Sequence, residues 1–203
     1  VQKSEKGGTD RPIWAIDRGV NICRALSLPP AHLIGDRDSA AHDAWAWAEE
    51  HGARVHTFPP AKDFTDTELA LRIAAELMPC ALVILTGAFG GRFDHLMSAA
   101  SVAAHAALPC ILADEREALF FLHGDESLTI TCDSPPQAIS LLPFTEECTG
   151  ITTNGLRWEL SNAQIHTHSS TTISNVLAEG NTEHRFSVTL GSGILGVYLC
   201  HKE

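Results

Sequence analysis

The stretch His32-Leu33-Ile34-Gly35-Asp36-Arg37-Asp38-Ser39 decides how we expect the chain to fold. A short apolar strand runs into a loop with two carboxylates, and an alanine-rich helical pattern follows. This order is typical of an α/β sheet, which binds ligands at the carboxyl ends of its strands. Asp36 and Asp38 stand two residues apart, so their oxygens can converge on one hard cation such as magnesium. The alternative is that Asp38 or Ser39 only caps the helix.

Short apolar runs alternate with helical patterns through the first half of the chain. We expect strands at Ile13–Ile16, Leu33–Ile34, Arg54–Phe58, Ala81–Leu85 and Cys110–Ala113, and helices at Val20–Leu26, Ser39–His51, Leu69–Leu77 and Leu96–Ala107. The continuous apolar run at 81–85 is typical of a parallel strand that is buried on both faces. The alternation predicts an α/β domain with a parallel sheet over residues 1–116.

The pattern changes after Glu115 to short alternating strands separated by turns, with no further helix. We expect strands at Leu119–Leu122, Leu128–Thr131, Ala138–Leu142, Ala163–Thr167, Phe186–Leu190 and Ile194–Leu199. Asn154-Gly155 is typical of a hairpin turn. Residues 117–203 are therefore predicted to form an all-β domain, either a sandwich or a barrel-like fold.

Composition excludes several kinds of protein. None of the apolar runs in the 203 residues is long enough to span a membrane, and residues 1–12 lack the apolar core of a secretory signal. The six cysteines include no C-x-x-C pair, so we expect reduced thiols and a cytoplasmic location. The net charge of -11 argues against a nucleic-acid partner, but it suits a cationic substrate or a metal-bound anion.

Polar residues gather where predicted strands and helices meet. Asp17 ends the first strand, where a carboxylate can reach a ligand or cap the next helix. The stretch Lys62-Asp63-Phe64-Thr65-Asp66-Thr67-Glu68 opens a helix, and Thr65 with Glu68 forms a capping-box pattern. The other charged residues of this stretch are not needed for capping, although acidic residues in a first turn also favour the helix dipole. A role for them in a site and a purely structural role both stay open.

A glycine-rich turn, Thr86-Gly87-Ala88-Phe89-Gly90-Gly91-Arg92-Phe93-Asp94-His95, joins a predicted strand to a predicted helix. Such a turn lets backbone N–H groups approach a phosphate, and the N-terminus of the helix adds positive potential. The stretch matches neither the dinucleotide-binding nor the P-loop pattern. Arg92 is placed to meet a phosphate, and Asp94 can serve as a metal ligand, a base or a cap.

Two stretches of the second half carry residues suited to binding. Trp158, beside a turn, can stack on a flat or cationic ring or belong to the core. The polar stretch Ser169–Asn175 can read a heterocycle or remain a solvated loop. His166 and His168 share one face of a predicted strand and would permit a metal, but the sequence offers no third ligand nearby.

Six of these stretches together resemble the thiamine pyrophosphokinase family, and the resemblance extends from Ile13 to Leu199. They occur in the family's order: Ala15–Asn21, Gly35–Ser39, Lys62–Glu68, Thr86–His95, Gly155–Leu160 and Ser169–Asn175. The resemblance implies a Rossmann-like α/β domain followed by a β-sandwich domain, in a homodimer whose active site lies between the subunits. It implies that ATP and Mg2+ are used to convert thiamine to thiamine diphosphate, with AMP released.

The resemblance also implies a role for individual residues. The catalytic aspartates would be Asp36, Asp38, Asp66 and Asp94; the first three would hold the metal, and Asp66 or Asp94 would accept the proton of the thiamine hydroxyl. ATP would be bound by Asp17, Lys62, Gly90, Gly91 and Arg92. Thiamine would be bound by Trp158, Ser174 and Asn175, reaching the metal site of a partner subunit.

The chain departs from the family pattern at three places. Arg18 replaces a glycine of the usual Asp-Gly-Gly, and Arg37 replaces an apolar residue between the paired aspartates. Residues 1–12 do not resemble the family's first strand, so this part of the chain is either divergent or incomplete. These departures concern the nucleotide side more than the reaction.

Two other functions remain as alternatives. A non-catalytic sensor of thiamine or its diphosphate would use the Trp158 side and would need no metal triad. A metal-dependent nucleotide hydrolase would use water in place of thiamine and would release AMP without it. The clustered carboxylates argue against the sensor.

Overall fold

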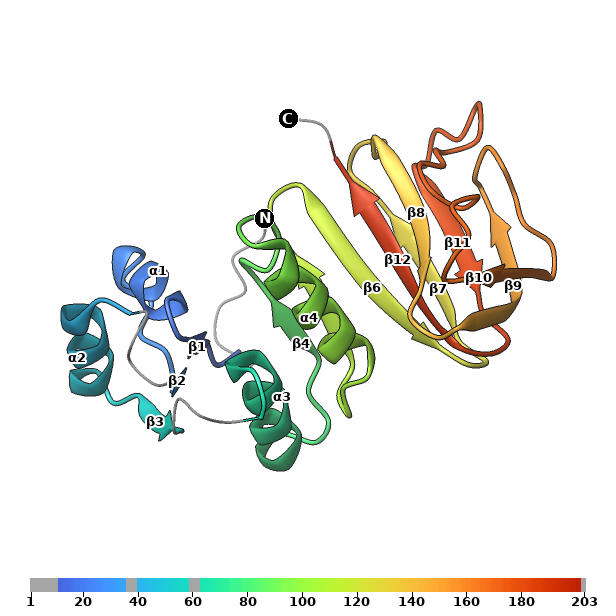
Figure 1. Cartoon of the computed structure of the whole chain (residues 1–203). Coiled ribbons are helices and arrows are strands. Elements are labelled where there is room, and N and C mark those ends of the chain that lie inside the picture. The colour runs from blue at the N-terminus through green and yellow to red at the C-terminus, as the bar shows by residue number, and fades with distance from the viewer. Residues whose placement is uncertain (1–10, 36–39, 59–62, 202–203) are drawn as a thin grey trace. The chain divides into compact units, whose positions relative to one another are not determined.

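The computed structural model describes residues 11–35, 40–58 and 63–201 (Figure 1). The chain divides into two compact units, Val1–Ile73 and Ala74–Glu203. Asp36, Asp38 and Lys62, three of the predicted site residues, lie outside the described residues.

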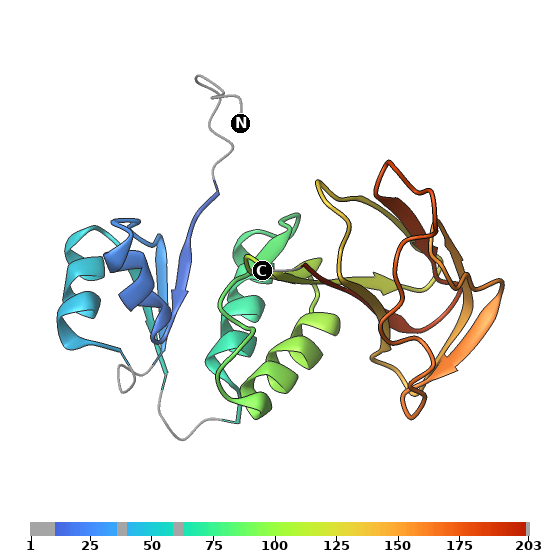
Figure 2. The same ribbon diagram turned by 90° about the horizontal axis from the view of Figure 1, so that it is seen from above.

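The first unit holds a three-stranded parallel sheet. Its elements are β1 (Trp14–Ile16), α1 (Gly19–Ala25), β2 (His32–Gly35), α2 (His42–Glu50), β3 (Arg54–Thr57) and the first part of α3 (Asp66–Leu77). The strand order is β1-β2-β3, and Ala15 pairs with Leu33, which pairs with Val55. Helices α1 and α2 cover one face of this sheet (Figures 1 and 2). Ala15 and Leu33 are buried there against Val20 of α1 and Trp45 of α2.

Three rings are stacked on the other face of the same sheet. The ring of Trp14 lies 4.0 Å from that of His32, and His32 Nδ1 lies 2.9 Å from His56 Nε2. Burial lowers the pKa of His32, and the charges of His56 and Arg54 lower it further. One of the two imidazoles must be neutral to accept the hydrogen bond between them, so the stack favours the neutral form of His32.

The second unit contains two β-sheets and the helix α4 (Phe93–Ala104). The five-stranded sheet has the order β4 (Val83–Leu85), β5 (Cys110–Ala113), β6 (Glu117–His123), β12 (Ile194–Cys200) and β8 (Ala138–Pro143). Only β4 and β5 are parallel in it. The four-stranded sheet is antiparallel, in the order β10 (Ala163–His166), β9 (Glu147–Asn154), β11 (Arg185–Thr189) and β7 (Ser127–Thr131).

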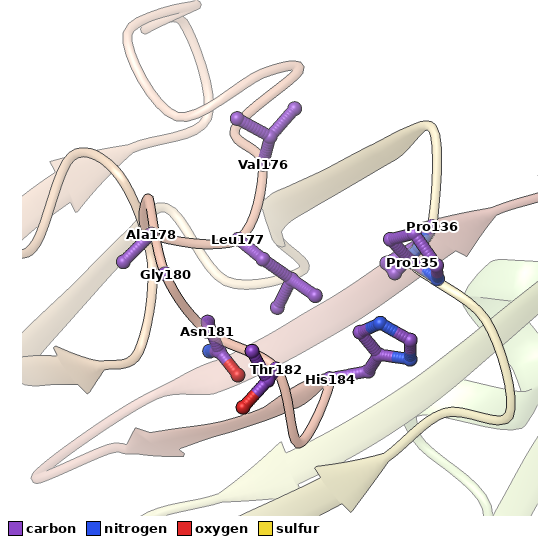
Figure 3. Close-up of a pocket in the computed structure, with 9 residues that line it drawn as sticks. All are labelled: Pro135, Pro136, Val176, Leu177, Ala178, Gly180, Asn181, Thr182 and His184. Atoms are coloured by element: carbon purple, nitrogen blue, oxygen red, sulfur yellow. The ribbon is translucent and has the colours of Figure 1, made fainter.

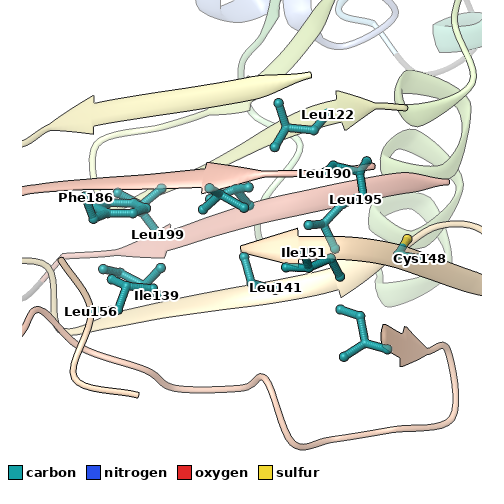
Figure 4. Close-up of a cluster of buried hydrophobic side chains, with 13 residues drawn as sticks. Leu122, Ile139, Leu141, Cys148, Ile151, Leu156, Phe186, Leu190, Leu195 and Leu199 are labelled. Atoms are coloured by element: carbon teal, nitrogen blue, oxygen red, sulfur yellow. The ribbon is translucent and has the colours of Figure 1, made fainter. Parts of the chain in front are cut away.

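One hydrophobic core joins the two sheets of this unit (Figure 4). Leu141 and Leu195 come from the five-stranded sheet, while Ile151 and Val188 come from the four-stranded sheet, and all four are buried. The burial of apolar area contributes roughly 25 cal/mol per Å², so this shared core is what stabilises the paired sheets. The connections at its rim carry the candidate binding residues.

The prediction of a parallel sheet with helices, followed by a part made of strands, is confirmed in this form. The domain boundary expected after residue 116 falls at the turn between β5 and β6 and stays a prediction. Within the described residues, no helix has the length and apolar character needed to cross a membrane. All six cysteines are free thiols.

The structure departs from the sequence-based expectations at one predicted strand, one strand that was missed and one predicted turn. The run at 81–85 was expected to be buried on both faces, but Ile84 is 59% exposed, because its side chain lies on a face of β4 that other described residues leave uncovered. Among the described strands, β4 pairs with β5 alone. The strand β9 was not predicted, because Gly150, with φ +69°, interrupts the alternation and Thr153 places a polar side chain in the core. Asn154-Gly155 does not form a two-residue hairpin and instead begins the longer connection 155–162 between β9 and β10.

Candidate active site

Asp17 lies against the end of the strand that leads to the paired aspartates. Its N–H donates to the carbonyl of Ile34 at 2.9 Å, and its φ is +46°. The neighbouring Gly35 has φ +146°, and a Cβ at that position would lie 2.1 Å from Asp17 Oδ1. Only glycine fits there, because its missing side chain leaves room for the carboxylate. The structure thus places Asp17 beside the residue that immediately precedes Asp36.

The start of α3 shows how much of its polar stretch serves the helix itself. Thr65 Oγ1 accepts the N–H of Glu68 at 3.2 Å, which is half of the predicted capping box. The carboxylate of Glu68 instead accepts from Arg72 at 2.8 Å, and this guanidinium also lies 4.0 Å from the Phe64 ring centroid. Asp66 is the first residue of the helix, where a carboxylate complements the dipole.

The glycine-rich turn between β4 and α4 is open at its glycines. Gly87, Gly90 and Gly91 have φ of +73°, +81° and +75°, and a Cβ at any of them would meet nothing within 4 Å. Backbone conformation, and not tight packing, is therefore what favours glycine at these positions. The open space leaves the backbone of the turn accessible to a ligand.

Arg92 and Asp94, predicted for the phosphate side, are paired with each other. Arg92 Nε donates to Asp94 Oδ1 at 3.0 Å and Nη2 donates to Oδ2 at 2.5 Å. The hydrogen bonds and charge of Arg92 lower the pKa of Asp94, which also accepts the N–H of His95. An acidic carboxylate of this kind is ionised at neutral pH and is a weak proton acceptor. Both side chains are exposed, so a phosphate can replace the carboxylate of Asp94 as the partner of Arg92.

A contact from the last strand supports this turn. The ring of Phe89 lies 6.4 Å from that of Tyr198 on β12. The hydroxyl of Tyr198 in turn donates to the carboxylate of Glu117 on β6. Burial and this hydrogen bond raise the pKa of Tyr198 well above its ordinary value, so the hydroxyl keeps its proton. No sequence pattern indicates the contact between Phe89 and Tyr198, which lie more than a hundred positions apart in the chain.

The structure brings Trp158 and Asn175 together. Asn175 Oδ1 accepts the N–H of Trp158 at 3.2 Å, and Asn175 Nδ2 donates to the carbonyl of Trp158 at 2.8 Å. The indole of Trp158 is 58% exposed, which excludes the core role that the sequence left open. Ser174 has φ +62° and donates its N–H to Ser140 Oγ at 3.0 Å. The predicted thiamine residues therefore lie on one rim of the second unit.

His166 and His168 form a stacked pair with ring centroids 5.3 Å apart. Glu147 of the adjacent strand lies 3.7 Å from His166, a neighbour that the sequence did not indicate. In the described parts of the chain, no group of three or more histidine, cysteine, aspartate or glutamate residues is placed to hold a metal ion. The metal prediction for Asp36 and Asp38 lies outside those parts and is not tested by this result.

A shallow pocket of about 370 Å³ lies beside the segment that follows Asn175 (Figure 3). Nine residues line it: Pro135, Pro136, Val176, Leu177, Ala178, Gly180, Asn181, Thr182 and His184. Asn181 donates through Nδ2 to the carbonyls of Gly155 and Arg185 and accepts the N–H of Arg185. Its amide therefore holds loops together, and we assign the pocket no ligand.

Family comparisons define the class of protein to which this arrangement belongs. The model described as "Thiamin pyrophosphokinase, catalytic domain" matches residues 9–111. The model described as "Thiamin pyrophosphokinase, vitamin B1 binding domain" matches residues 127–195. Both models describe parts of one class of enzyme, a kinase with a separate vitamin-binding part. The chain belongs to the thiamin pyrophosphokinase family.

Individual relatives agree with this assignment. Thiamine pyrophosphokinase of Bacillus subtilis is 28% identical over 186 residues, which are 89% of this chain and 86% of that protein. A crystal structure of thiamine pyrophosphokinase from Bacillus subtilis has a TM-score of 0.81 and 25% identity, covering 96% of this chain and 91% of the other. The enzyme from Geobacillus thermodenitrificans has a TM-score of 0.78 and 25% identity, with coverage of 97% and 89%.

Proposed function

We propose that the chain is an ATP-dependent thiamine pyrophosphokinase that gives thiamine diphosphate and AMP. The observation that carries this function is the family membership over both halves of the chain. The match to the vitamin-binding part argues against a nucleotide hydrolase, and the match to the catalytic part argues against a sensor. We also assign the finer architecture that goes with this function, a Rossmann-like catalytic domain followed by a β-sandwich domain.

The chemistry is the transfer of a diphosphate group. The hydroxyl oxygen of thiamine forms a bond to the β-phosphorus of ATP, the bond from that phosphorus to the bridging oxygen of AMP breaks, and the hydroxyl proton passes to a base. Such reactions depend mainly on alignment and on neutralisation of charge. Arg92 can bind a phosphate oxygen once it leaves Asp94, and the open glycines of the same turn can offer backbone N–H groups.

We assign the metal to Asp36, Asp38 and Asp66, with Asp17 at the edge of the site. Carboxylate oxygens are the ligands that magnesium prefers, and the contact of Asp17 with Gly35 supports an acidic site at the end of β2. When bound, the metal supplies positive charge that orients and neutralises the phosphates. The base that takes the hydroxyl proton is Asp66 or Asp94. Asp94 is the weaker acceptor while its pairing with Arg92 lowers its pKa, and Asp66 is the weaker acceptor when it binds the metal.

We assign the thiamine side to Trp158, Ser174 and Asn175 and the nucleotide side to Lys62, Gly90, Gly91 and Arg92. The exposed indole of Trp158 supports this assignment, because a ring held at the surface can stack on a flat cationic ligand. We also propose a homodimer in which this rim completes the metal site of the partner subunit. Gel filtration with light scattering tests the dimer.

Product analysis tests the function. The purified chain is incubated with ATP, magnesium and thiamine, and we expect thiamine diphosphate and AMP in equal amounts. Asp36→Asn and Asp38→Asn should each lose most turnover, while Asp133→Asn, which changes an exposed carboxylate on the connection between β7 and β8, should not. A chelator should abolish both products. AMP without thiamine diphosphate would identify a hydrolase, and bound thiamine without either product would identify a sensor.

A further inference from the structure

Trp158 is held at the end of a short ribbon made by two connecting segments. The N–H of Arg157 donates to the carbonyl of Val176 at 2.8 Å, and the N–H of Ala178 donates to the carbonyl of Gly155 at 3.0 Å. Leu156, which is 2% exposed, anchors this ribbon in the core. The side chain of Asn175 adds the next pair of hydrogen bonds, to the backbone of Trp158.

The ribbon is itself attached to the five-stranded sheet. The backbone of Asn175 exchanges two hydrogen bonds with Ile139 of β8, both of 2.8 Å. The amide of Asn175 makes a third hydrogen bond, since its Oδ1 also accepts the N–H of Val176 at 2.9 Å. The backbone of Trp158 is therefore fixed while its ring stays in solvent, and a ring presented in this way costs little further ordering when a ligand stacks on it.

The ring of Trp158 already has a cation beside it. The guanidinium carbon of Arg157 lies 5.0 Å from the centroid of the ring, within the range of a cation–π interaction. The face of the indole attracts one positive charge, and a second charge within the Debye length of about 8 Å is repelled by the first. A cationic ring that stacks on Trp158 must displace Arg157 or bind close to it.

We propose that Arg157 is a specificity-determining residue, a resident cation on the Trp158 ring that weakens the binding of the positively charged thiazolium ring of thiamine relative to an uncharged ring. This inference rests on the proposed function, because it requires thiamine to stack on Trp158. Arg157 thereby lowers the affinity of the Trp158 ring for thiamine and speeds the dissociation of the cationic ring after the reaction.

Equilibrium titration calorimetry tests the proposal with two ligands. The ligands are thiamine and an analogue in which an uncharged aromatic ring replaces the thiazolium. Arg157→Gln should tighten thiamine binding by about 2- to 4-fold, the factor that corresponds to the repulsion between two unit charges about 5–8 Å apart in water. The same variant should leave the affinity for the uncharged analogue unchanged. Arg116→Gln makes the same charge change on the turn before β6 and should alter neither affinity. The gain for thiamine should shrink at high salt.

The outcomes separate the inference from the function on which it rests. Weaker thiamine binding by Arg157→Gln would show that Arg157 contacts the ligand, and an equal gain for both ligands would show a steric cover without a charge effect. An unchanged affinity would also overturn the proposal. Trp158→Ala is the separating variant: if it leaves thiamine affinity unaltered, the stacking platform itself is wrong. If Trp158→Ala weakens binding and Arg157→Gln does not tighten it, only the role of Arg157 fails.

Discussion

Replacing Gly35 by alanine should disrupt the first unit at the position where β2 leads to the paired aspartates. A Cβ at this position would lie 2.1 Å from Asp17 Oδ1 and 3.2 Å from Asp17 Cγ. The carboxylate must therefore move, and the backbone must hold φ +146° with a side chain attached. The movement of the carboxylate displaces Asp17, a predicted site residue. The strained backbone at residue 35 lowers stability through its conformation alone.

The size of the effect follows from these two terms. A non-glycine residue in such a conformation costs about 1–3 kcal/mol, and overpacking against the carboxylate costs about 1–3 kcal/mol more. The sum of about 2–6 kcal/mol is a large share of the roughly 5–15 kcal/mol that stabilises an ordinary domain. Gly52→Ala is the matched control. Its φ is +87°, and nothing lies within 4 Å of its Cβ, so it should cost only about 1–2 kcal/mol.

Urea unfolding followed by tryptophan fluorescence measures these differences. Trp14, Trp45 and Trp47 belong to the first unit, so the signal reports mainly on that unit. The decisive variant is the double substitution with Asp17→Gly, which removes the carboxylate at a position of positive φ where glycine adds no strain. The double-mutant cycle should give a coupling of about 1–3 kcal/mol. A coupling below about 0.5 kcal/mol would refute the predicted contact between Gly35 and Asp17.

Three further outcomes are expected. Trp158→Ala should raise the KM for thiamine about tenfold through lost stacking and change the free energy of unfolding by less than about 0.5 kcal/mol; a large loss of stability with unchanged KM would return the residue to a structural role. Arg92→Gln should raise the pKa of Asp94 toward its ordinary value, as measured by NMR titration of the carboxyl carbon, and an unmoved pKa would contradict the observed pairing. Burial holds the pKa of His32 in the folded protein below its ordinary value of 6.5. As the pH falls, the unfolded chain therefore takes up the proton first, and protonation favours the unfolded state. Stability should therefore fall as the pH drops through about 6.5, and His32→Gln should flatten this dependence in denaturation curves; an equal slope in both proteins would argue against it.

The sequence was sufficient to predict those helices and strands that are determined by the local spacing of apolar residues. The strand at 110–113 was predicted with the observed bounds, and the helix after the glycine-rich turn was displaced by only three residues at each end. Apolar periodicity determines these elements because their side chains pack against a core in register. The capping by Thr65 was likewise predicted, because it depends on residues three positions apart.

Features that depend on long-range contacts were missed. The strand β9 carries Gly150 and the buried Thr153, so its residues do not alternate between apolar and polar as a predictable strand does. Its extended conformation comes from pairing with β10 and β11. The pairing of Arg92 with Asp94 and the position of Arg157 over Trp158 are side-chain choices that the sequence does not determine. The family resemblance could indicate which stretches form the site, but not that these side chains already have partners.

Five of the described glycines fall into two groups that selection experiments would separate. At Gly87, Gly90 and Gly91 the surroundings are open, so asparagine, which tolerates positive φ, should accumulate in a library screened only for folded protein. At Gly155 and Gly193 a Cβ would meet a backbone carbonyl oxygen at 2.6 and 2.7 Å, so the same screen should keep glycine there. If the turn binds phosphate through its backbone, a screen for thiamine diphosphate synthesis should restore glycine at 87, 90 and 91. The difference between the two screens would mark, residue by residue, where glycine serves the reaction and where it serves the fold.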